Sequence, residues 1–136
     1  MRGVIREIVQ ESADVRRFRI VGDAPLRHRP GQFVMLGIPG LDLSRPYSVA
    51  SSPTEQEYFE LLIRHVEGGR FTTPLFEKRV GDEVEVRGPF GTFYFREGTF
   101  APVVLIGGGT GLAPLRAMVQ YLVAKGIHLP VRLFWV

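Results

Sequence analysis

The segment RPYSVASSP, residues 45–53, holds three kinds of ligand-binding group within four positions. Arg45 supplies a fixed positive charge with several N–H donors, Tyr47 an aromatic face and Ser48 a hydroxyl. Each also has an ordinary explanation, because arginines are commonly solvated, tyrosines often lie half-buried in strands, and serines before a proline are typical of turns. On a regular strand Arg45 and Tyr47 share one face and Ser48 points to the other, unless the strand bends or bulges.

The segment GGGTGLAP, residues 107–114, is expected to join a strand to a helix. Glycines at such a junction let the backbone approach a phosphate, and the N-terminus of a helix favours an anion. The segment does not match the dinucleotide fingerprint G-x-G-x-x-G. A tight turn without a ligand is therefore the alternative interpretation.

A second glycine pair lies in GGRFT, residues 68–72, just before an expected short helix that begins near 71–73. The glycines free the backbone, and the first N–H groups of the helix need a partner. A phosphate is one candidate for that partner. The hydroxyl of Thr72, acting as a plain helix cap, is the other.

Composition limits what else the chain can do. It has 136 residues, 45% of them hydrophobic, which fits one packed domain or one domain with part of another. No apolar run approaches the length of a membrane span and no secretory signal is visible, so we expect a cytoplasmic protein. With no cysteine, the chain has no catalytic thiol, disulfide or cysteine-bound iron–sulfur cluster.

Charge and histidine spacing argue against two further classes of function. The net charge is +3, but basic and acidic residues are interleaved, so we expect no nucleic-acid binding. A mildly basic face suits the docking of an acidic redox partner. The three histidines have no ligand spacing, so no metal site is predicted.

Before residue 100 the sequence reads as antiparallel strands, and after it as a different kind of unit. Period-two alternation is clearest in DEVEVRG, where Val84 and Val86 face one way and the charged residues the other. Six strands spaced by turns predict a small closed barrel, mainly β, over residues 1–99. The other five strands are expected near residues 3–10, 14–21, 31–38, 45–51 and 56–66.

Residues 100–136 predict a βαβ unit. Two runs, VVLI and RLFWV, are apolar at nearly every position, which is typical of parallel strands covered on both faces. Between them, apolar residues recur at helical spacing, Pro114 suits a first turn, and Gly126 is placed to end the helix. One helix cannot cover both faces, so this unit looks incomplete, as the opening of a nucleotide-binding domain. It is expected to expose apolar surface.

Five markers in order resemble the ferredoxin-NADP reductase-like flavoproteins, and within them the bacterial oxygenase and phenol-hydroxylase reductases. The resemblance covers the whole chain and implies an FAD-binding six-stranded Greek-key barrel followed by an NAD(P)-binding domain. The markers are PGQFVML at 30–36, RPYSVAS at 45–51, GGRFT at 68–72, GDEVEVRGPFGTF at 81–93 and GGGTGLAP at 107–114.

The resemblance implies roles for residues of the barrel. In such proteins the arginine of RPYS neutralises the flavin pyrophosphate, the tyrosine packs against the isoalloxazine or ribityl group, and the serine hydroxyl bonds near flavin N5. These roles fall on Arg45, Tyr47 and Ser48, with Pro46 between them. FAD needs a fork of N–H donors, a π-surface and a small hydroxyl, which RPYS supplies. The strand and loop that line the adenosine and pyrophosphate add Ile63, Arg64, Gly69, Arg70, Phe71 and Thr72 as candidates.

The resemblance also implies that NAD(P)H, the co-substrate, meets the flavin beside the glycine segment. Thr110 is then the candidate for a nicotinamide contact and, with Ser48, for a catalytic role, while Gly109, Gly111 and Pro114 shape the turn. The family's later segments, including a C-G-x-P motif and the residues that read the adenosine ribose, lie outside these 136 residues.

Our leading hypothesis is an FAD-dependent oxidoreductase module that passes electrons from NAD(P)H to a ferredoxin, an iron–sulfur domain or an oxygenase. The alternative is a flavin-binding electron-transfer subunit without its own NAD(P)H site. A third interpretation is a barrel without flavin that serves association. The incomplete βαβ unit also predicts self-association or a partner chain.

Overall fold

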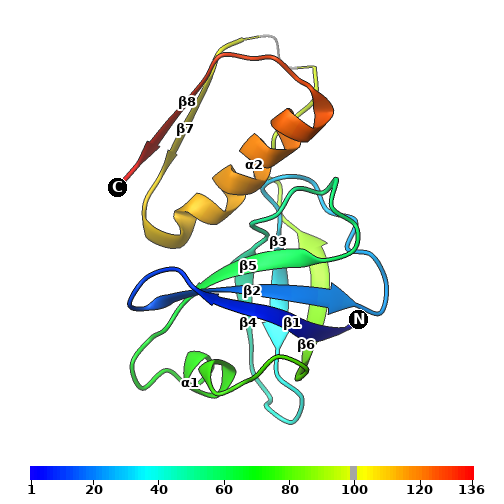
Figure 1. Ribbon diagram of the computed structural model, residues 1–136, viewed down its shortest axis with the longest axis vertical. Coiled ribbons are helices and arrows are strands. Elements are labelled where there is room, and N and C mark those ends of the chain that lie inside the picture. Colours follow the sequence, from blue (N-terminus) through cyan, green and yellow to red (C-terminus); the bar gives the residue numbers. More distant parts are fainter. Residues whose placement is uncertain (99–100) are drawn as a thin grey trace.

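The barrel strands follow the alternation of the sequence. A computed structural model describes residues 1–98 and 101–136. Val84 and Val86 of DEVEVRG are buried and their charged neighbours are exposed or half-buried, as predicted. All six predicted strands form (Figure 1): β1 (Arg2–Gln10), β2 (Val15–Gly22), β3 (Phe33–Gly37), β4 (Ser44–Ser48), β5 (Phe59–Arg64) and β6 (Glu83–Phe90).

The six strands form one antiparallel sheet in the order β4-β3-β6-β1-β2-β5. Neighbours that are not consecutive in sequence, such as β3 with β6 and β2 with β5, give Greek-key crossovers. The two end strands meet at a bridge between Val49 and Leu61, where the Ala50 N–H also donates to the Glu60 carbonyl at 2.7 Å. The sheet therefore curls into the predicted barrel.

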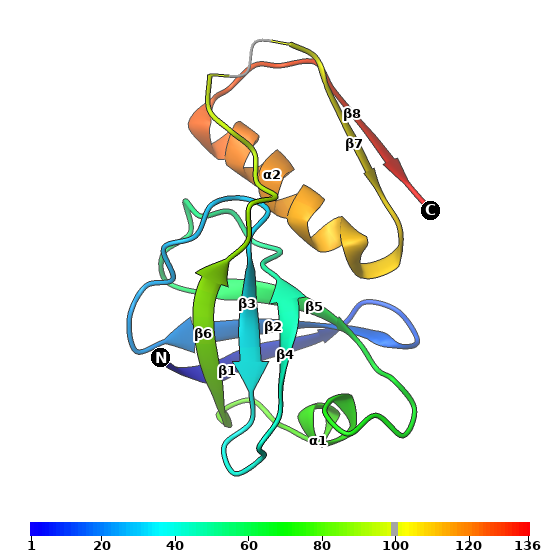
Figure 2. The same ribbon diagram turned by 180° about the vertical axis from the view of Figure 1, so that it is seen from behind.

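One hydrophobic core fills the barrel. Its residues come from β1, β2, β3, β5, β6 and the segments beside them, and they include Phe18, Phe59, Leu61 and Ile63, all nearly or fully buried. A short helix, α1 (Thr72–Phe76), begins where the sequence predicted a helix and lies across one end of the barrel (Figure 2). Its Leu75 and Phe76 pack against the same core.

The second unit is the predicted βαβ unit (Figure 1). Strand β7 (Val103–Gly107) leads through a 3-10 turn (Gly109–Gly111) into helix α2 (Leu112–Lys125), and β8 (Val131–Trp135) pairs with β7 in parallel. Gly126 ends α2 in the left-handed conformation, with a φ of 64°. The expected domain boundary, between residues 99 and 100, lies outside the described residues.

Helix α2 covers only one face of the two-stranded sheet. Leu105 packs against Leu115 and Met118 of α2. On the strands, large apolar side chains such as Ile106, 74% exposed, and Phe134, 55% exposed, face solvent, so the expected exposed apolar surface is present. Among the described residues, no helix is long and apolar enough to cross a membrane.

Candidate functional site

The residues of RPYS lie on β4, at one end of the sheet order. β4 pairs in regular register with β3, so Tyr47 is opposite Val34, Arg45 is opposite Leu36, and Ser48 is opposite Phe33. Opposed residues share a face in an antiparallel pair, so Arg45 and Tyr47 are on one face and Ser48, with Pro46, on the other. The register between β3 and β4 contains no bulge. The bend that could have brought Arg45, Tyr47 and Ser48 to one face therefore does not occur in this pair of strands.

The polar groups of RPYS have little to bind within the protein. Arg45 is exposed, and within residues 1–98 and 101–136 its guanidinium makes only one long hydrogen bond, of 3.4 Å, to the carbonyl of its neighbour Ser44. Half-buried Ser48 makes no side-chain hydrogen bond to any of the described residues. The N–H fork and the hydroxyl are therefore both available to a ligand.

Tyr47 connects RPYS to the GGRFT segment. Its ring centroid lies 6.0 Å from that of Phe71, with the planes tilted by 32°. Phe71 is almost fully buried in the barrel core. Burial raises the pKa of Tyr47 to about 12, against the opposing charge of Arg45, so its phenol stays protonated and neutral at physiological pH. Two motifs separated in sequence thus meet through their aromatic rings.

The loop that carries GGRFT is closed by Thr72. The Thr72 hydroxyl accepts a hydrogen bond from the Val66 N–H at 3.0 Å and donates one to the Val66 carbonyl at 3.1 Å. Helix α1 has no side-chain cap, so the interpretation of Thr72 as a helix cap is wrong. Its hydroxyl instead bonds both backbone groups of Val66 and so closes the loop, because threonine side chains readily form hydrogen bonds with nearby backbone groups.

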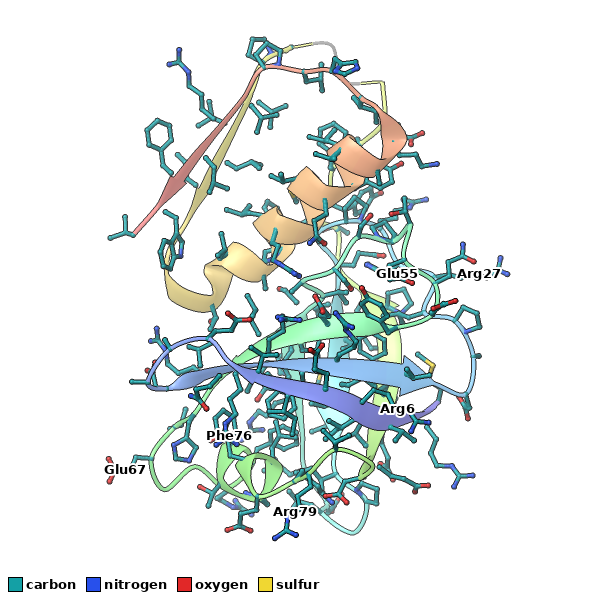
Figure 3. All side chains as sticks on the ribbon, viewed as in Figure 1. Arg6, Arg27, Glu55, Glu67, Phe76 and Arg79 are labelled. Atoms are coloured by element: carbon teal, nitrogen blue, oxygen red, sulfur yellow. The ribbon has the colours of Figure 1, made fainter. Side chains whose placement is uncertain are left out.

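The remainder of this loop lies open to solvent. Gly68 has a φ of 67°, which favours glycine, and a Cβ at Gly69 would lie 2.6 Å from the Thr72 hydroxyl oxygen. Arg70 is exposed and makes no ion pair or hydrogen bond with the described residues. Glu67, at the outer side of the loop, points away from the barrel (Figure 3). Arg70 precedes Phe71 directly, so the Tyr47–Phe71 contact brings the segments that carry Arg45 and Arg70 together.

The two candidates on β5 differ in accessibility. The side chain of Ile63 is fully buried in the barrel core, so only its backbone can meet a ligand. Arg64 is exposed, and its Nε lies 3.3 Å from a carboxylate oxygen of Asp14. Its guanidinium also lies against Gly109, where an added Cβ would be 3.1 Å from Arg64 Nη2. Gly109 therefore allows β5 and the glycine turn to approach closely.

The glycine turn faces a cleft between the barrel and the βαβ unit. The cleft has a volume of about 680 Å³, and its lining includes Arg64, Gly109 and Thr110. Thr110 is half-buried, and its hydroxyl makes no hydrogen bond to the described residues. Gly111 is exposed, and Pro114 is buried in the first turn of α2. Three candidates named from sequence thus share one cavity, separate from the Tyr47–Phe71 contact.

Trp135 is a residue that sequence reasoning missed. Its indole Nε1 donates to the Gly109 carbonyl at 3.0 Å, and the Gly109 N–H donates to the Val136 carbonyl at 3.1 Å. The end of β8 therefore fixes the glycine turn. The parallel pairing of VVLI with RLFWV was the available signal, since it places the ends of both strands together.

Glu60 and Arg116 are the other omissions. Glu60 is buried at the barrel surface, and Arg116 of α2 reaches it with an Nη1–Oε2 distance of 2.8 Å. A single glutamate within the apolar run FELLIR was the signal for an unusual carboxylate. No group of side chains suited to a metal ion is found in the described ranges 1–98 and 101–136.

Comparison with known proteins decides the family. The model of the oxidoreductase FAD-binding domain matches residues 2–95, which include four of the five sequence markers and all of β1–β6. The chain belongs to the oxidoreductase FAD-binding domain family. The resemblance expected from the markers is confirmed, and the matched region is the barrel.

Relatives of this FAD-binding domain include reductase components of oxygenase systems. The chain is 35% identical over 134 residues to the phenol 2-monooxygenase reductase component DmpP of Pseudomonas sp. (strain CF600), covering 98% of this chain and 38% of the relative. It is 36% identical over 136 residues to the ferredoxin--NAD(P)(+) reductase component of the naphthalene 1,2-dioxygenase system of Pseudomonas putida, covering 99% and 41%. The chain thus spans about two fifths of the length of these relatives.

Solved structures agree with the fold. The cytochrome P450 reductase GcoB of Amycolatopsis superposes with a TM-score of 0.89 at 37% identity, over 98% of this chain and 41% of that one. The ferredoxin reductase of a carbazole 1,9a-dioxygenase gives a TM-score of 0.90 at 32% identity, over 99% and 41%. Both matches extend past the barrel through the βαβ unit.

The side chains of this FAD-binding domain fit its cofactor. FAD carries a diphosphate, which needs cationic N–H donors, and a large ring system, which needs an aromatic or apolar surface. Arg45 and Arg70 are cations without an ion-pair partner among the described residues, and each is within two residues in sequence of one ring of the Tyr47–Phe71 contact. Because Gly69 has no Cβ, the backbone of the loop between β5 and α1 can lie close to the Thr72 hydroxyl.

Proposed function

We propose that this chain is the FAD-binding module of an NAD(P)H-dependent reductase that delivers electrons to a protein acceptor. The observation that carries the proposal is the Tyr47–Phe71 contact, which unites two sequence motifs beside an arginine that makes no ion pair with the described residues. When bound, FAD would supply the redox chemistry, namely uptake of a hydride (two electrons and one proton) from NAD(P)H, which leaves NAD(P)+, and return of the electrons one at a time.

Arg45, Tyr47 and Ser48 would bind the flavin from β4. Arg45 would pair with the pyrophosphate through two parallel N–H donors, Tyr47 would cover an apolar part of the flavin, and Ser48 would donate to flavin N5. Arg45 and Ser48 are on opposite faces of β4, but β4 ends the sheet order. The bridge between Val49 and Leu61 lies just past β4, so a ligand along the unpaired edge of β4 before this bridge can meet side chains from both faces, with Pro46 between them.

The loop between β5 and α1 would hold the remainder of the cofactor. Arg70 would add a second cation to the pyrophosphate, and the backbone around Gly69 would approach it closely. Phe71 supports Tyr47 from the core. Thr72, whose hydroxyl is engaged by Val66, would act by fixing the loop. Ile63 would contribute its backbone only.

Thr110 would orient the nicotinamide in the cleft. Its hydroxyl is not engaged by the described residues, and the neighbouring Gly109 lets Arg64 approach the same cavity. Gly111 and Pro114 would shape the turn. No side-chain nucleophile is assigned here, because hydride transfer between nicotinamide and flavin requires none.

The acceptor would be a redox protein of the ferredoxin, iron–sulfur or oxygenase type, and the reductase would work in the cytoplasm. The chain's relatives include reductase components of oxygenase systems. The net charge of +3 suits an acidic partner. The second candidate, a flavin-binding subunit without its own NAD(P)H site, is favoured by the exposed apolar face of β7 and β8, which another chain could cover.

The first experiment is a visible absorbance spectrum of the purified chain, followed by anaerobic NADH and then NADPH. A flavin spectrum that bleaches supports the reductase. A flavin spectrum that stays oxidised supports the subunit without an NAD(P)H site. No flavin after reconstitution with FAD contradicts both.

Ser48→Ala is expected to slow reduction of the bound flavin about tenfold while leaving FAD content nearly unchanged. The reason is that the hydroxyl supplies one hydrogen bond, of about 1–1.5 kcal/mol, at the reacting nitrogen. Stopped-flow absorbance measures the rate, and Ser48→Thr, which keeps a hydroxyl, is the control. Equal losses of rate and FAD content in Ser48→Ala would show that Ser48 is only structural.

The exposed face of β7 and β8 is expected to make the chain self-associate. Ile106→Glu should shift the sedimentation profile toward monomer, because it puts a charge in the centre of that face. Val80→Glu is the matched control, since Val80 is also exposed, at 58%, but lies on the barrel. A parent chain that sediments as a monomer at all concentrations contradicts the prediction.

A further inference from the structure

Glu60 divides its two carboxylate oxygens between the two units of the fold. Oε1 accepts from Arg17 at 2.6 Å and from Arg19 at 3.0 Å, both on the neighbouring strand β2. Oε2 accepts from Arg116 of helix α2 at 2.8 Å. The Glu60 side chain is only 3% exposed, so water does not compete freely for these bonds. One carboxylate thus ties the barrel to α2.

Glu60 is ionised in this arrangement. Burial by itself would raise its pKa, but hydrogen bonds and charges from Arg116, Arg19 and Arg17 outweigh burial, and the pKa lies below its ordinary value. Buried ion pairs contribute little net stability compared with apolar packing, yet removing one partner leaves a costly unpaired charge. Such a cluster is therefore better suited to fixing one geometry than to stabilising the fold.

The same face of α2 binds the segment that follows RPYS. Arg116 Nη1 also donates to the Ala50 carbonyl at 2.8 Å, and the Ser52 N–H donates to Gln120 Oε1 at 3.2 Å. Residues four apart lie on one side of a helix, so Arg116 and Gln120 together hold residues 50–52. The strand that carries Arg45 and Ser48 is thereby joined at its end to α2.

The other end of this connection is the glycine turn. Helix α2 begins at Leu112, directly after Gly109–Gly111, and Arg116 lies about one helical turn further on. On β5, Glu60 and Arg64 share the outer face, about 13 Å apart. Arg116 meets Glu60, and Gly109 meets Arg64. A tilt of α2 about Glu60 would therefore move Thr110 relative to the barrel.

We propose that Glu60 is a positioning residue that sets the angle of α2 against the barrel. It thereby holds the turn at Gly109–Gly111 at a fixed position relative to β4. It acts through Arg116, which lines the cleft beside Thr110, whereas Glu60 itself is not among the residues that line this cleft. Its consequence for electron transfer rests on the proposed function, whereas its effect on geometry does not.

The test measures that geometry directly. The chain has no cysteine, so spin labels can be attached at introduced cysteines only. Glu77→Cys on the barrel and Val123→Cys on α2 are both exposed positions outside the cluster. Pulsed electron paramagnetic resonance on this double-labelled chain should give one narrow distance distribution. Glu60→Gln and Arg116→Gln should each broaden or shift this distance distribution. Arg116→Lys, which keeps the positive charge, should leave the distribution as in the parent chain.

Glu83→Gln is the matched control, because Glu83 forms an exposed ion pair with Arg2 and is not bonded to α2. It should leave the distance unchanged. If Glu60→Gln does not fold, Arg116→Gln decides, since Glu60 then keeps Arg17 and Arg19. An unchanged narrow distance in the glutamine variants of the cluster that fold overturns the proposal.

Activity provides the second readout. Glu60→Gln should retain FAD but slow its reduction by NADH or NADPH about tenfold or more, since small misplacement of reacting groups is costly. Glu60 does not line the cleft, whereas Arg116 does, so this variant separates misplacement from a lost direct contact. A parent chain that binds no FAD, or whose flavin neither NADH nor NADPH reduces, contradicts the proposed reductase, while the distance measurement still decides the role of Glu60. An unchanged reduction rate together with a changed distance would overturn the link between this joint and catalysis.

Discussion

Arg45→Ala is expected to lose most of its FAD on dialysis. A charge-assisted hydrogen bond is worth about 1.5–3 kcal/mol, so the dissociation constant should rise roughly 10–150-fold. The loss should be large because Arg45 makes no ion pair within the described protein, and its guanidinium is therefore available to the pyrophosphate. Flavin absorbance after dialysis and fluorescence titration with FAD measure the effect.

Arg6→Ala is the matched control for Arg45→Ala. Arg6 is also exposed and has no hydrogen bond or ion pair with the described residues, and it points to solvent from β1 (Figure 3). Strands β6 and β3 separate β1 from β4 in the sheet. Its removal should leave FAD affinity unchanged, since it takes away the same charge at another place. Equal FAD retention in both variants would refute the role of Arg45.

Gly31→Ala is expected to destabilise the chain by more than about 3 kcal/mol. Gly31 has a φ of 119°, and a Cβ there would lie 2.4 Å from the Phe93 carbonyl oxygen and 2.7 Å from Met118 of α2. Backbone atoms cannot rotate away, so the cost of the clash adds to backbone strain of about 1–3 kcal/mol. Chemical denaturation followed by circular dichroism gives the free energy of unfolding.

Gly81→Ala separates strain from collision. Gly81 also has a positive φ, 99°, but a Cβ there would meet nothing within 4 Å. Its alanine variant should lose only about 1–2 kcal/mol, the cost of the left-handed backbone alone. If Gly31→Ala is no less stable than Gly81→Ala, the close crossing at Gly31 is not a constraint on the fold.

The crossing at Gly31 gives the PGQFVML marker a physical meaning. The Pro30 carbonyl accepts from the Phe95 N–H at 2.9 Å, and the Gln32 amide donates to the Gly91 carbonyl at 3.0 Å. These two hydrogen bonds hold the segment that follows β6, at residues 91 and 95, against residues 30–32. The marker thus serves to join the barrel to the βαβ unit, and no local pattern indicated which backbone would lie against the glycine.

The strands and helices could be predicted from local sequence patterns, because each is determined by a few neighbouring residues. Alternation in DEVEVRG identified β6, and Gly126 identified the end of α2, since each depends on a few neighbouring residues. Contacts between distant segments were harder to predict. The sequence allows Thr72 to act as a helix cap, but its hydroxyl binds Val66, six residues earlier, because the loop folds back on itself.

Glu60 shows the limit for the candidate site. Arg17 and Arg19 alternate on β2, and their pairing with one glutamate depends on the β2–β5 register, which the sequence did not supply. The third partner comes from α2, more than fifty residues later in the chain. By contrast, the family resemblance assigns Tyr47 and Phe71 to one ligand, but it does not predict the contact between their rings.

The hydrogen bond from Trp135 to Gly109 gives the chain an intrinsic optical reporter. Trp135 is the only tryptophan of the chain, it is 56% exposed, and it lines the cleft beside Thr110. Indole emission depends on the polarity around the ring, and a flavin absorbs in the range where indole emits. Fluorescence excited in the ultraviolet will therefore follow events at the glycine turn in the unmodified protein, without a dye or a mutation.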